Sequence, residues 1–257
     1  MKELTPETVG RDLGTRFMGQ RVVCYETIAS TNDAAKQLAV EGASEGTVVI
    51  AEEQTAGRGR HGRRWFAPAG SSLLVSSILR PSLSPAELPL LLMASALAVA
   101  QAIEESTGLL VNLKWPNDIL LGNRKTGGVL IETGLSGEDV DYAVIGTGLN
   151  VNADMATIPQ LATTATSISA ELGESASRLK ILRALLRCME REYLLLQSGA
   201  SPASRWAGRL SQLGQQVEVD TPWGREIGRV EGVDADGTLI LLRSDGTMAH
   251  ITVGDVT

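Results

Sequence analysis

The sequence of 257 residues contains few of the features that mark secreted, redox-active or membrane-inserted proteins. Its two cysteines, Cys24 and Cys188, match no metal-binding or redox spacing, so we interpret both as buried apolar residues in a reducing compartment. The N-terminus has no apolar core of a signal peptide. The longest apolar run, Leu88 to Ile103, contains polar residues and is shorter than the ~20 residues that span a bilayer. These absences predict a cytoplasmic protein without a membrane partner.

The balance of charge argues against a general surface for nucleic acid. The formal net charge is −7, so any site for an anion must be local. A hydrophobic content of 43% with 21% charged residues is ordinary for a globular protein. The length allows one large domain, or one large and one small domain. We therefore expect no nucleic-acid partner.

Positive charge is concentrated in residues 57–65, which we call the Arg loop. It contains three glycines, four arginines and one tryptophan. Glycine lets the backbone approach a ligand closely, guanidinium groups fork onto carboxylate or phosphate, and Trp65 offers a flat apolar face. This composition predicts a clamp for an anion that also carries a ring. Because the like charges have no partners nearby in the sequence, we expect the loop to be disordered without a ligand.

Two nucleotide-binding motifs do not account for the Arg loop. Gly57, Gly59 and Gly62 match the dinucleotide fingerprint by spacing, but that fingerprint opens a helix, and here Pro68 follows within a few residues. A P-loop requires Gly-Lys-Ser/Thr at its end, which the sequence lacks here. By itself, an Arg/Gly run is also typical of a solvated loop or an RNA-binding segment, although the acidic charge balance opposes RNA binding.

The pattern of the whole chain predicts an α+β domain followed by a small β domain. We expect strands at 21–25, 47–51, 72–79, 110–114, 119–121, 129–132 and 142–145, and helices at 30–40, 84–108, 178–197 and 203–213. From residue 214, short strands separated by Asp-Gly turns predict a small, partly open SH3-like barrel. The predicted domains are therefore 1–213 and 214–257.

Four motifs occur together in a fixed order: the Arg loop, Lys114-Trp-Pro-Asn-Asp118, Lys125-x-Gly-Gly128 and Gly146-x-Gly-x-Asn150. In this combination the sequence resembles the biotin protein ligases, with specific motifs from about Tyr25 to Asn152. The resemblance implies a mixed, mostly antiparallel sheet flanked by helices, of the class II synthetase-like type, plus the small barrel. Many members also carry an N-terminal DNA-binding domain. Residues 1–19 leave no room for a recognition helix, so we expect the monofunctional type.

The reaction implied by this resemblance has two steps. The carboxylate of biotin attacks the α-phosphate of Mg-ATP, which gives biotinyl-5'-AMP and pyrophosphate. A lysine of an acceptor domain, the biotin carboxyl carrier protein of acetyl-CoA carboxylase or a related carboxylase, then attacks the mixed anhydride and releases AMP. Fixed cations must offset the repulsion between the two anionic substrates. Biotin, ATP and Mg²⁺ are thus the expected small molecules, and the sequence leaves open whether the chain forms the homodimer common in the family.

The resemblance also implies roles for individual residues. The implied catalytic residues are Lys125, Arg60, Arg58 and Asp118, with Lys125 between the carboxylate and the α-phosphate, Arg60 holding the intermediate and Asp118 meeting the acceptor lysine. The implied biotin contacts are Ser30, Thr31, Asn32, Gln54, Gly57, Arg58, Gly59, Arg60, Lys125 and Gly128. The implied ATP contacts are Arg58, Arg63, Trp65, Asn117, Lys125 and Asn150. No protein ligand for the metal is assigned with certainty: Mg²⁺ comes with the phosphates, and Asn117 is its candidate contact.

Structural interpretations stay open for several residues. Ser30 is also a plausible helix cap with Asp33 as its reciprocal partner. Trp115 is interpreted as a buried indole at a strand end, and Glu132 is as consistent with a structural role as with a functional one. His61 and His250 are interpreted as surface residues.

A second function from another class is a non-catalytic regulator that binds biotin or a nucleotide on the same scaffold. The joint presence of Lys125, Arg58 and Arg60 disfavours it, because binding alone does not require all three. Release of pyrophosphate from ATP when biotin is added separates the two functions.

Overall fold

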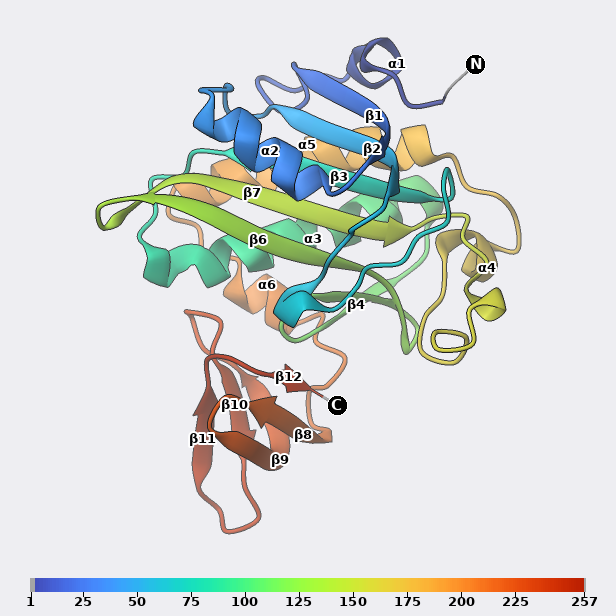
Figure 1. Cartoon of the computed structure of the whole chain (residues 1–257). Coiled ribbons are helices and arrows are strands. Elements are labelled where there is room, and N and C mark those ends of the chain that lie inside the picture. The colour runs from blue at the N-terminus through green and yellow to red at the C-terminus, as the bar shows by residue number, and fades with distance from the viewer. Residues whose placement is uncertain (1–2, 257) are drawn as a thin grey trace.

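The computed structural model describes residues 3–256, so residues 1, 2 and 257 of the predicted domain ranges lie outside the described part of the chain. A seven-stranded sheet forms the larger part of the molecule (Figure 1). The strand order is β1-β2-β3-β7-β6-β5-β4, in which β1 and β2 are parallel and the other neighbours are antiparallel. The expected mixed, mostly antiparallel sheet flanked by helices is confirmed.

Most of the expected elements are present, with shifted ends. The strands are β1 Val22–Ile28, β2 Val48–Gln54, β3 Ser72–Leu79, β4 Val111–Lys114, β5 Asp118–Leu121, β6 Arg124–Ser136 and β7 Asp139–Asn150. The helices are α1 Pro6–Gly10, α2 Thr31–Val40, α3 Leu88–Thr107, α4 Ile168–Leu172, α5 Arg178–Gln197 and α6 Ala203–Ala207, with 3₁₀ turns at Arg60–Gly62, Pro85–Glu87 and Met155–Thr157. The helix expected at 203–213 ends early because the following backbone pairs with Leu113 of β4 through Arg209 and Ser211.

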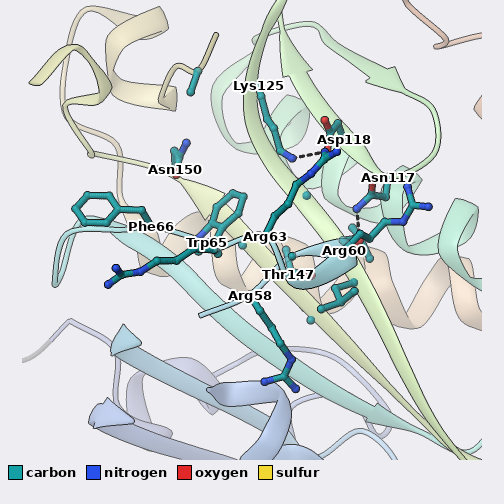
Figure 2. A pocket seen from close by; sticks show the side chains of 18 of the residues that line it. Arg58, Arg60, Arg63, Trp65, Phe66, Asn117, Asp118, Lys125, Thr147 and Asn150 are labelled. Atoms are coloured by element: carbon teal, nitrogen blue, oxygen red, sulfur yellow. Dashed lines mark hydrogen bonds and ion pairs between the residues drawn. The ribbon is translucent and has the colours of Figure 1, made fainter. Parts of the chain in front are cut away.

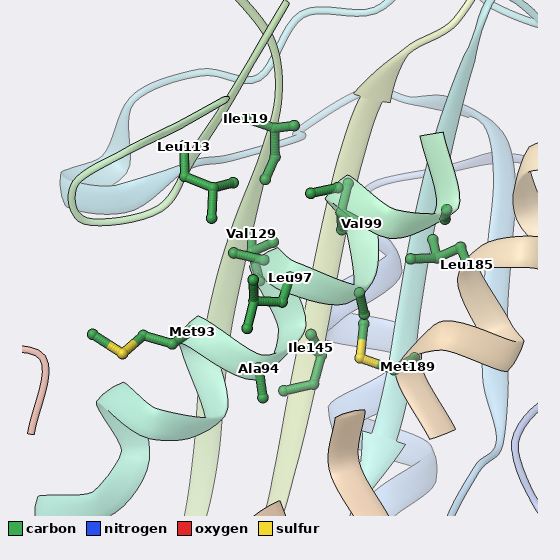
Figure 3. Packing of buried hydrophobic residues seen from close by; sticks show 14 of the residues in the cluster. Met93, Ala94, Leu97, Val99, Leu113, Ile119, Val129, Ile145, Leu185 and Met189 are labelled. Carbon is green, nitrogen blue, oxygen red and sulfur yellow. The ribbon is translucent and has the colours of Figure 1, made fainter. Parts of the chain in front are cut away.

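The main core lies between the seven-stranded sheet and the helices α3 and α5 (Figure 3). Leu97 of α3, Ile145 of β7 and Leu185 of α5 are almost fully buried in it. Each such side chain contributes roughly 1.5–3 kcal/mol of burial free energy relative to exposure. The helix α3 and the 3₁₀ turn before it start as predicted, with a capping box between Ser84 and Glu87. The helix ends at Gly108, which has a φ of 76°.

By length and composition alone, Pro85–Thr107 is long and apolar enough to cross a membrane. The expectation of a run too short to span was therefore wrong, because it counted only the apolar core and left out the turns that extend the helix at both ends. Most residues of this helix are buried inside the protein, against the sheet and α5. An apolar surface on nearly all sides is what a helix in the core of a globular protein requires.

The opposite face of the sheet supports α2. Val49, Ile78 and Val144 point to this face and pack with Ala35 and Ala39 of the helix. Side chains along a strand alternate between the two faces of the sheet. The residues that follow Val144 on this face are therefore Gly146, Gly148 and Asn150.

Small residues leave the same face hollow beyond the start of α2. Ser76 of β3 pairs with Gly146, and Gly148 pairs with Gly128 of β6. Because glycine has no side chain, three neighbouring strands leave space above the sheet at this point.

The helix α2 begins without the expected capping box. Ser30 occupies the N-cap position, yet among the described residues its side chain makes no capping hydrogen bond. Gln54 takes over this role, because its Oε1 accepts a hydrogen bond of 2.7 Å from the backbone N of Thr31. Asp33, the expected reciprocal partner, is bound by Arg58 instead.

A second sheet of five strands contains the C-terminal residues. Its strands are β8 Gln216–Thr221, β9 Gly224–Val233, β10 Leu239–Leu242, β11 Met248–Ile251 and β12 Asp255–Val256. The order β11-β10-β9-β8-β12 has two free edges, so the strands that the structure describes do not close into a barrel. The predicted β domain is confirmed as a sheet, whereas the boundary between residues 213 and 214 stays a prediction.

The two cysteines differ in exposure. Cys188 on α5 is buried as expected, but Cys24 is partly exposed because β1 is an edge strand of the sheet. Burial raises the pKa of both thiols, to about 12 for Cys188, so both are protonated at neutral pH.

Candidate active site

A cavity of about 280 Å³ opens above the hollow part of the seven-stranded sheet (Figure 2). It brings together the start of α2, the Arg loop, the 114–118 corner and the C-terminal strand β12. All predicted site residues line this cavity except Gly57. Gly57 lies at the base of the Arg loop, where its carbonyl accepts a hydrogen bond of 2.9 Å from the backbone N of Trp65.

One end of the cavity is a polar pocket at the start of α2. Thr31 and Asn32 are 3% and 5% exposed. Oε1 of Gln54 accepts a hydrogen bond of 2.9 Å from the Thr31 hydroxyl. The Ser76 hydroxyl donates to Asn32 Oδ1 at 2.6 Å and lies 2.8 Å from Thr31 Oγ1. These bonds hold hydroxyl and amide groups in fixed orientations, which suits a small ring that carries both N–H and C=O groups.

Lys125 is the cation at the middle of the cavity. Its Nζ lies 2.5 Å from Asp118 Oδ1 and 5.9 Å from the centroid of the Trp65 ring (Figure 2). Sequence patterns place Lys125 in a turn before a strand, but it lies within β6. The strand includes Lys125 because this residue pairs with Leu120 of β5, and its backbone N and O also bond to Thr164 and Thr166 of the loop after β7.

The backbone of the Arg loop forms a turn that its own hydrogen bonds close, while its disorder without a ligand stays a prediction. Gly59 N donates to Arg63 O at 2.7 Å, which complements the bond between Trp65 and Gly57. The premise that its charges lack partners is wrong. Three carboxylates that are remote in sequence, Asp33, Glu132 and Asp255, supply counter-charges to Arg58, Arg60 and Arg63.

Arg58 is held between two of these carboxylates. Its Nη1 donates to Asp33 Oδ2 at 2.7 Å, and its Nη2 donates to Glu132 Oε2 at 2.9 Å. The hydrogen bonds from Arg58 lower the pKa of Asp33 to about 2, and the same contacts raise the pKa of Arg58. Burial opposes a charge on Glu132, but hydrogen bonds from Asn32, Arg58 and Lys36 outweigh it and lower the pKa of this carboxyl.

Arg60 and Arg63 share a carboxylate of the C-terminal sheet. Arg60 Nη1 donates to Asp255 Oδ1 at 3.1 Å and to Gly254 O at 3.2 Å, while Arg63 Nη2 donates to Asp255 Oδ2 at 2.8 Å. Burial lowers the pKa of Arg60, and Asp255 opposes this effect. A guanidinium stays protonated in proteins, so the cavity keeps its charge. No local motif marks Asp255, which lies 195 residues from Arg60 in the chain.

The other end of the cavity suits a nucleobase. The indole of Trp65 lies against Gly148, where a Cβ atom would stand 2.6 Å from its Cε2. Asn150 is 3% exposed, and its Nδ2 donates to Thr166 O at 3.1 Å. Among residues 3–256, its Oδ1 has no hydrogen-bond partner. A buried acceptor without a partner is costly, so a ligand with an amino group at this point satisfies it.

The donors for a metal ion are sparse. Among the described residues, no group of three or more His, Cys, Asp or Glu side chains is placed to hold one. Asn117 lines the cavity, and its Nδ2 donates to Val129 O at 2.8 Å. Such a site fits a divalent ion that arrives on phosphate oxygens better than an ion held by the protein alone.

Several structural interpretations hold. Trp115 is 4% exposed, and its Nε1 donates to Gly237 O at 3.0 Å, although its ring also lines the cavity. The side chains of His61 and His250 are more than half exposed.

The apolar residues that line the cavity were not predicted, because no sequence motif marks their positions. They include Phe66, Val75, Leu130, Met155, Leu161 and Ala165.

The fold and the cavity together define an enzyme that activates an anionic ring compound with a nucleotide. Comparison with protein families agrees with this class. A model described as the biotin/lipoate A/B protein ligase family matches residues 24–150, and one described as the biotin protein ligase C terminal domain matches residues 213–257.

Individual relatives narrow the class. The chain is 35% identical over 247 residues to the bifunctional ligase/repressor BirA of Bacillus subtilis, covering 95% of this chain and 76% of that protein. It is 32% identical to the biotin–[acetyl-CoA-carboxylase] ligase of Mycobacterium tuberculosis, covering 99% and 94%. The biotin protein ligase of Aquifex aeolicus in complex with biotin and ATP has a similar structure, with a TM-score of 0.78, 28% identity and coverage of 93% and 98%. The chain belongs to the biotin protein ligase family.

Proposed function

We propose that this chain activates biotin with Mg-ATP to biotinyl-5'-AMP and then transfers biotin to a lysine of a biotin carboxyl carrier protein. It is an ATP-dependent, AMP-forming ligase. The observation that carries the proposal is the order of groups along one cavity. Along β7, Asn32 of the ring pocket lies over Gly146, and the unpartnered Oδ1 of Asn150 lies at the end of the strand. Between them, the Lys125 ammonium lies beside Gly128, the pairing partner of Gly148.

Each substrate then has a place in the cavity. The ring of biotin contacts Thr31, Asn32 and Gln54, and its carboxylate extends toward Lys125. The amino group of adenine donates a hydrogen bond to Asn150 Oδ1, and the adenine ring lies beside the Trp65 indole. In this arrangement the carboxylate of biotin and the α-phosphate of ATP both lie next to the Lys125 ammonium, as the first step of the reaction requires.

Charge explains the first step. Two unit anions 4 Å apart repel by about 4 kcal/mol at an effective dielectric constant of 20. Lys125, Arg58 and Arg63 offset this repulsion and stabilise the charge that develops as a carboxylate oxygen attacks phosphorus and the bond to pyrophosphate breaks. Asn117 is the candidate contact for Mg²⁺, which would arrive on the phosphates and supply positive charge to the leaving group.

The second step needs a neutral amine near the mixed anhydride. Asp118 contacts Lys125 at 2.5 Å and lines the cavity, which supports a role for its carboxylate in orienting the lysine of an acceptor domain. The neutral amine attacks the carbonyl carbon, AMP leaves with the electron pair of the broken C–O bond, and the nitrogen releases one proton to solvent as the amide forms. Arg60, at the tip of the Arg loop, retains the adenylate until the acceptor arrives.

The direct test combines the purified chain with biotin, ATP, Mg²⁺ and a biotin carboxyl carrier domain. We expect one biotin per acceptor, linked to a single lysine, with AMP and pyrophosphate formed in equal amounts. An acceptor in which that lysine is replaced by arginine is the control. Biotin binding without pyrophosphate release would instead support the non-catalytic regulator, which no observation here favours.

The wider context of the enzyme is part of the proposal. We expect a cytoplasmic location because the reaction consumes ATP, and no nucleic-acid partner because the charge balance is acidic. Retention on DNA or RNA that falls steeply with salt would contradict the second expectation. Sedimentation velocity with and without biotin and ATP measures whether a homodimer forms.

A further inference from the structure

Glu132 on β6 joins two walls of the cavity that lie on different elements. Its Oε2 accepts a hydrogen bond of 2.6 Å from Asn32 Nδ2, at the start of α2. The same carboxylate accepts hydrogen bonds of 2.9 and 3.0 Å from Arg58 Nη2, in the Arg loop. Within the described chain, the cavity lining includes Asn32 and Arg58 but not Glu132. Glu132 therefore stands behind the two walls and connects them.

The position of Glu132 follows from the alternation of β6. Gly128, Leu130 and Glu132 point to the face that carries α2, so the carboxylate emerges beside the first turn of that helix. Its side chain is 25% exposed. A carboxylate in such a position is costly unless it is hydrogen-bonded, and Lys36 Nζ, at 3.0 Å, adds a third donor.

The two walls have different chemistry. Asn32 belongs to the buried network with Ser76 and Thr31 that forms the ring pocket. Arg58 carries a guanidinium, which Asp33 and Glu132 both bind at the cavity wall. Asp33 also binds Arg58, but its side chain is 52% exposed and forms its ion pairs with Arg58 and Lys36. Of the two carboxylates on Arg58, Glu132 is thus the one that also touches the ring pocket.

We propose that Glu132 is a positioning residue that couples recognition of the biotin ring by Asn32 to the placement of Arg58 on the anionic end of the substrate. The inference rests on the proposed function of the cavity. Glu132 does not contact the substrate. It orients the Asn32 amide so that Oδ1 faces Ser76, and it holds the guanidinium within the cavity wall. A ligand that orders one wall therefore also orders the other.

Glu132→Gln tests this coupling, because the amide has the same size but no negative charge, and its NH₂ group replaces the oxygen that accepts from Lys36 and Arg58. Two ligands separate the effects: biotin, and its alcohol analogue in which CH₂OH replaces the carboxylate. We expect affinity for biotin to fall about tenfold or more, as charged hydrogen bonds are lost, and affinity for the alcohol to fall clearly less. The kcat of pyrophosphate release should fall as well, since Arg58 is no longer held in place. Calorimetry and initial rates provide these values.

Glu138→Gln is the matched control, because it removes an exposed carboxylate at the tip of the same β6–β7 hairpin. We expect it to bind both ligands as the parent does. Equal losses for biotin and the alcohol in Glu132→Gln, or no loss for either, would overturn the coupling while the parent still forms adenylate. Failure of the parent to release pyrophosphate would instead overturn the proposed function.

Glu132→Asp keeps the test decisive if Glu132→Gln does not fold. The shorter side chain retains the charge but loses the reach to hold both partners together. The loss of affinity should again be larger for biotin than for the alcohol. Equal affinity ratios in Glu132→Asp and in the parent would refute the inference.

Discussion

Lys125 is the residue on which the chemistry of the cavity depends most directly. Its ammonium lies between Asp118 and the Trp65 ring, at the point where the two substrate anions are expected to meet. We predict that Lys125→Ala lowers biotin-dependent pyrophosphate release by at least about 100-fold, the effect typical of a lost electrostatic stabiliser. Biotin binding should survive in part, because the ring pocket is intact. Near-normal pyrophosphate release would refute this role.

Asp33 offers a test of the charge arrangement that needs no substrate. Its pKa is lowered from the ordinary value of 3.8 to about 2, chiefly by hydrogen bonds from Arg58. Because the pKa is lowered, the ion pair contributes its full stabilisation of the folded state above pH 3.8. This stabilisation is lost as the pH falls through about 2. We predict that the NMR titration of the Asp33 carboxyl has its midpoint near 2, and that Arg58→Ala moves it up toward 3.8. A parent midpoint already near 3.8 would contradict the pairing.

At the scale of the element, β7 separates the two ligand sites along one strand. A Cβ atom at Gly146 would overlap Oδ1 of Asn32, and one at Gly148 would stand 2.6 Å from Trp65 Cε2. We predict that Gly146→Ala raises the KM for biotin about tenfold or more, whereas Gly148→Ala chiefly raises the KM for ATP. A tenfold change corresponds to about 1.4 kcal/mol, which is the size of the loss expected when a hydrogen-bonded or ring contact is displaced. Initial rates of pyrophosphate release measure both constants.

Gly10→Ala is the control for these two variants. Gly10 lies in α1, and a Cβ atom there meets no described atom within 4 Å. Both KM values should stay unchanged in this variant. If Gly146→Ala altered only the KM for ATP, the assignment of the two ends of the cavity would have to be reversed.

At the scale of the whole molecule, the C-terminal sheet is connected to the Arg loop through the carboxylate of Asp255 and the carbonyl of Gly254. Asp255 on β12 binds both Arg60 and Arg63 of the Arg loop. We predict that Asp255→Asn increases tryptic cleavage between Arg58 and Arg64 several-fold, because the loop loses its attachment. The melting temperature should change little, since partly exposed ion pairs contribute about 0–1 kcal/mol each.

Mass spectrometry of the early tryptic fragments gives the site and the rate of cleavage. Asp245→Asn is the comparison, because that carboxylate lies in an exposed turn of the same sheet and contacts Thr247. Equal cleavage of the Arg loop in Asp255→Asn and in the parent would show that the C-terminal sheet does not restrain it.

Local patterns determined most of the elements. The capping box at Ser84 and the apolar run after it specify α3, and alternating residues specify the strands, since both signals depend on neighbours within one or two turns of chain. The motifs likewise predicted which residues would line one cavity. Ser30 shows the limit of such signals: its position at the start of α2 was correct, but a side chain from β2 replaced its cap.

The sequence by itself determined the order of the elements, the local concentration of cations in the Arg loop and the family to which the motifs point. Only the tertiary structure decided which carboxylates balance those cations, that Glu132 connects Asn32 to Arg58, and that the C-terminal strands stay open. The physical reason is distance along the chain. Helix periods and turn residues act between neighbours, whereas the partners of Arg58 and Arg60 lie up to 195 positions away and meet them only after the sheets have formed.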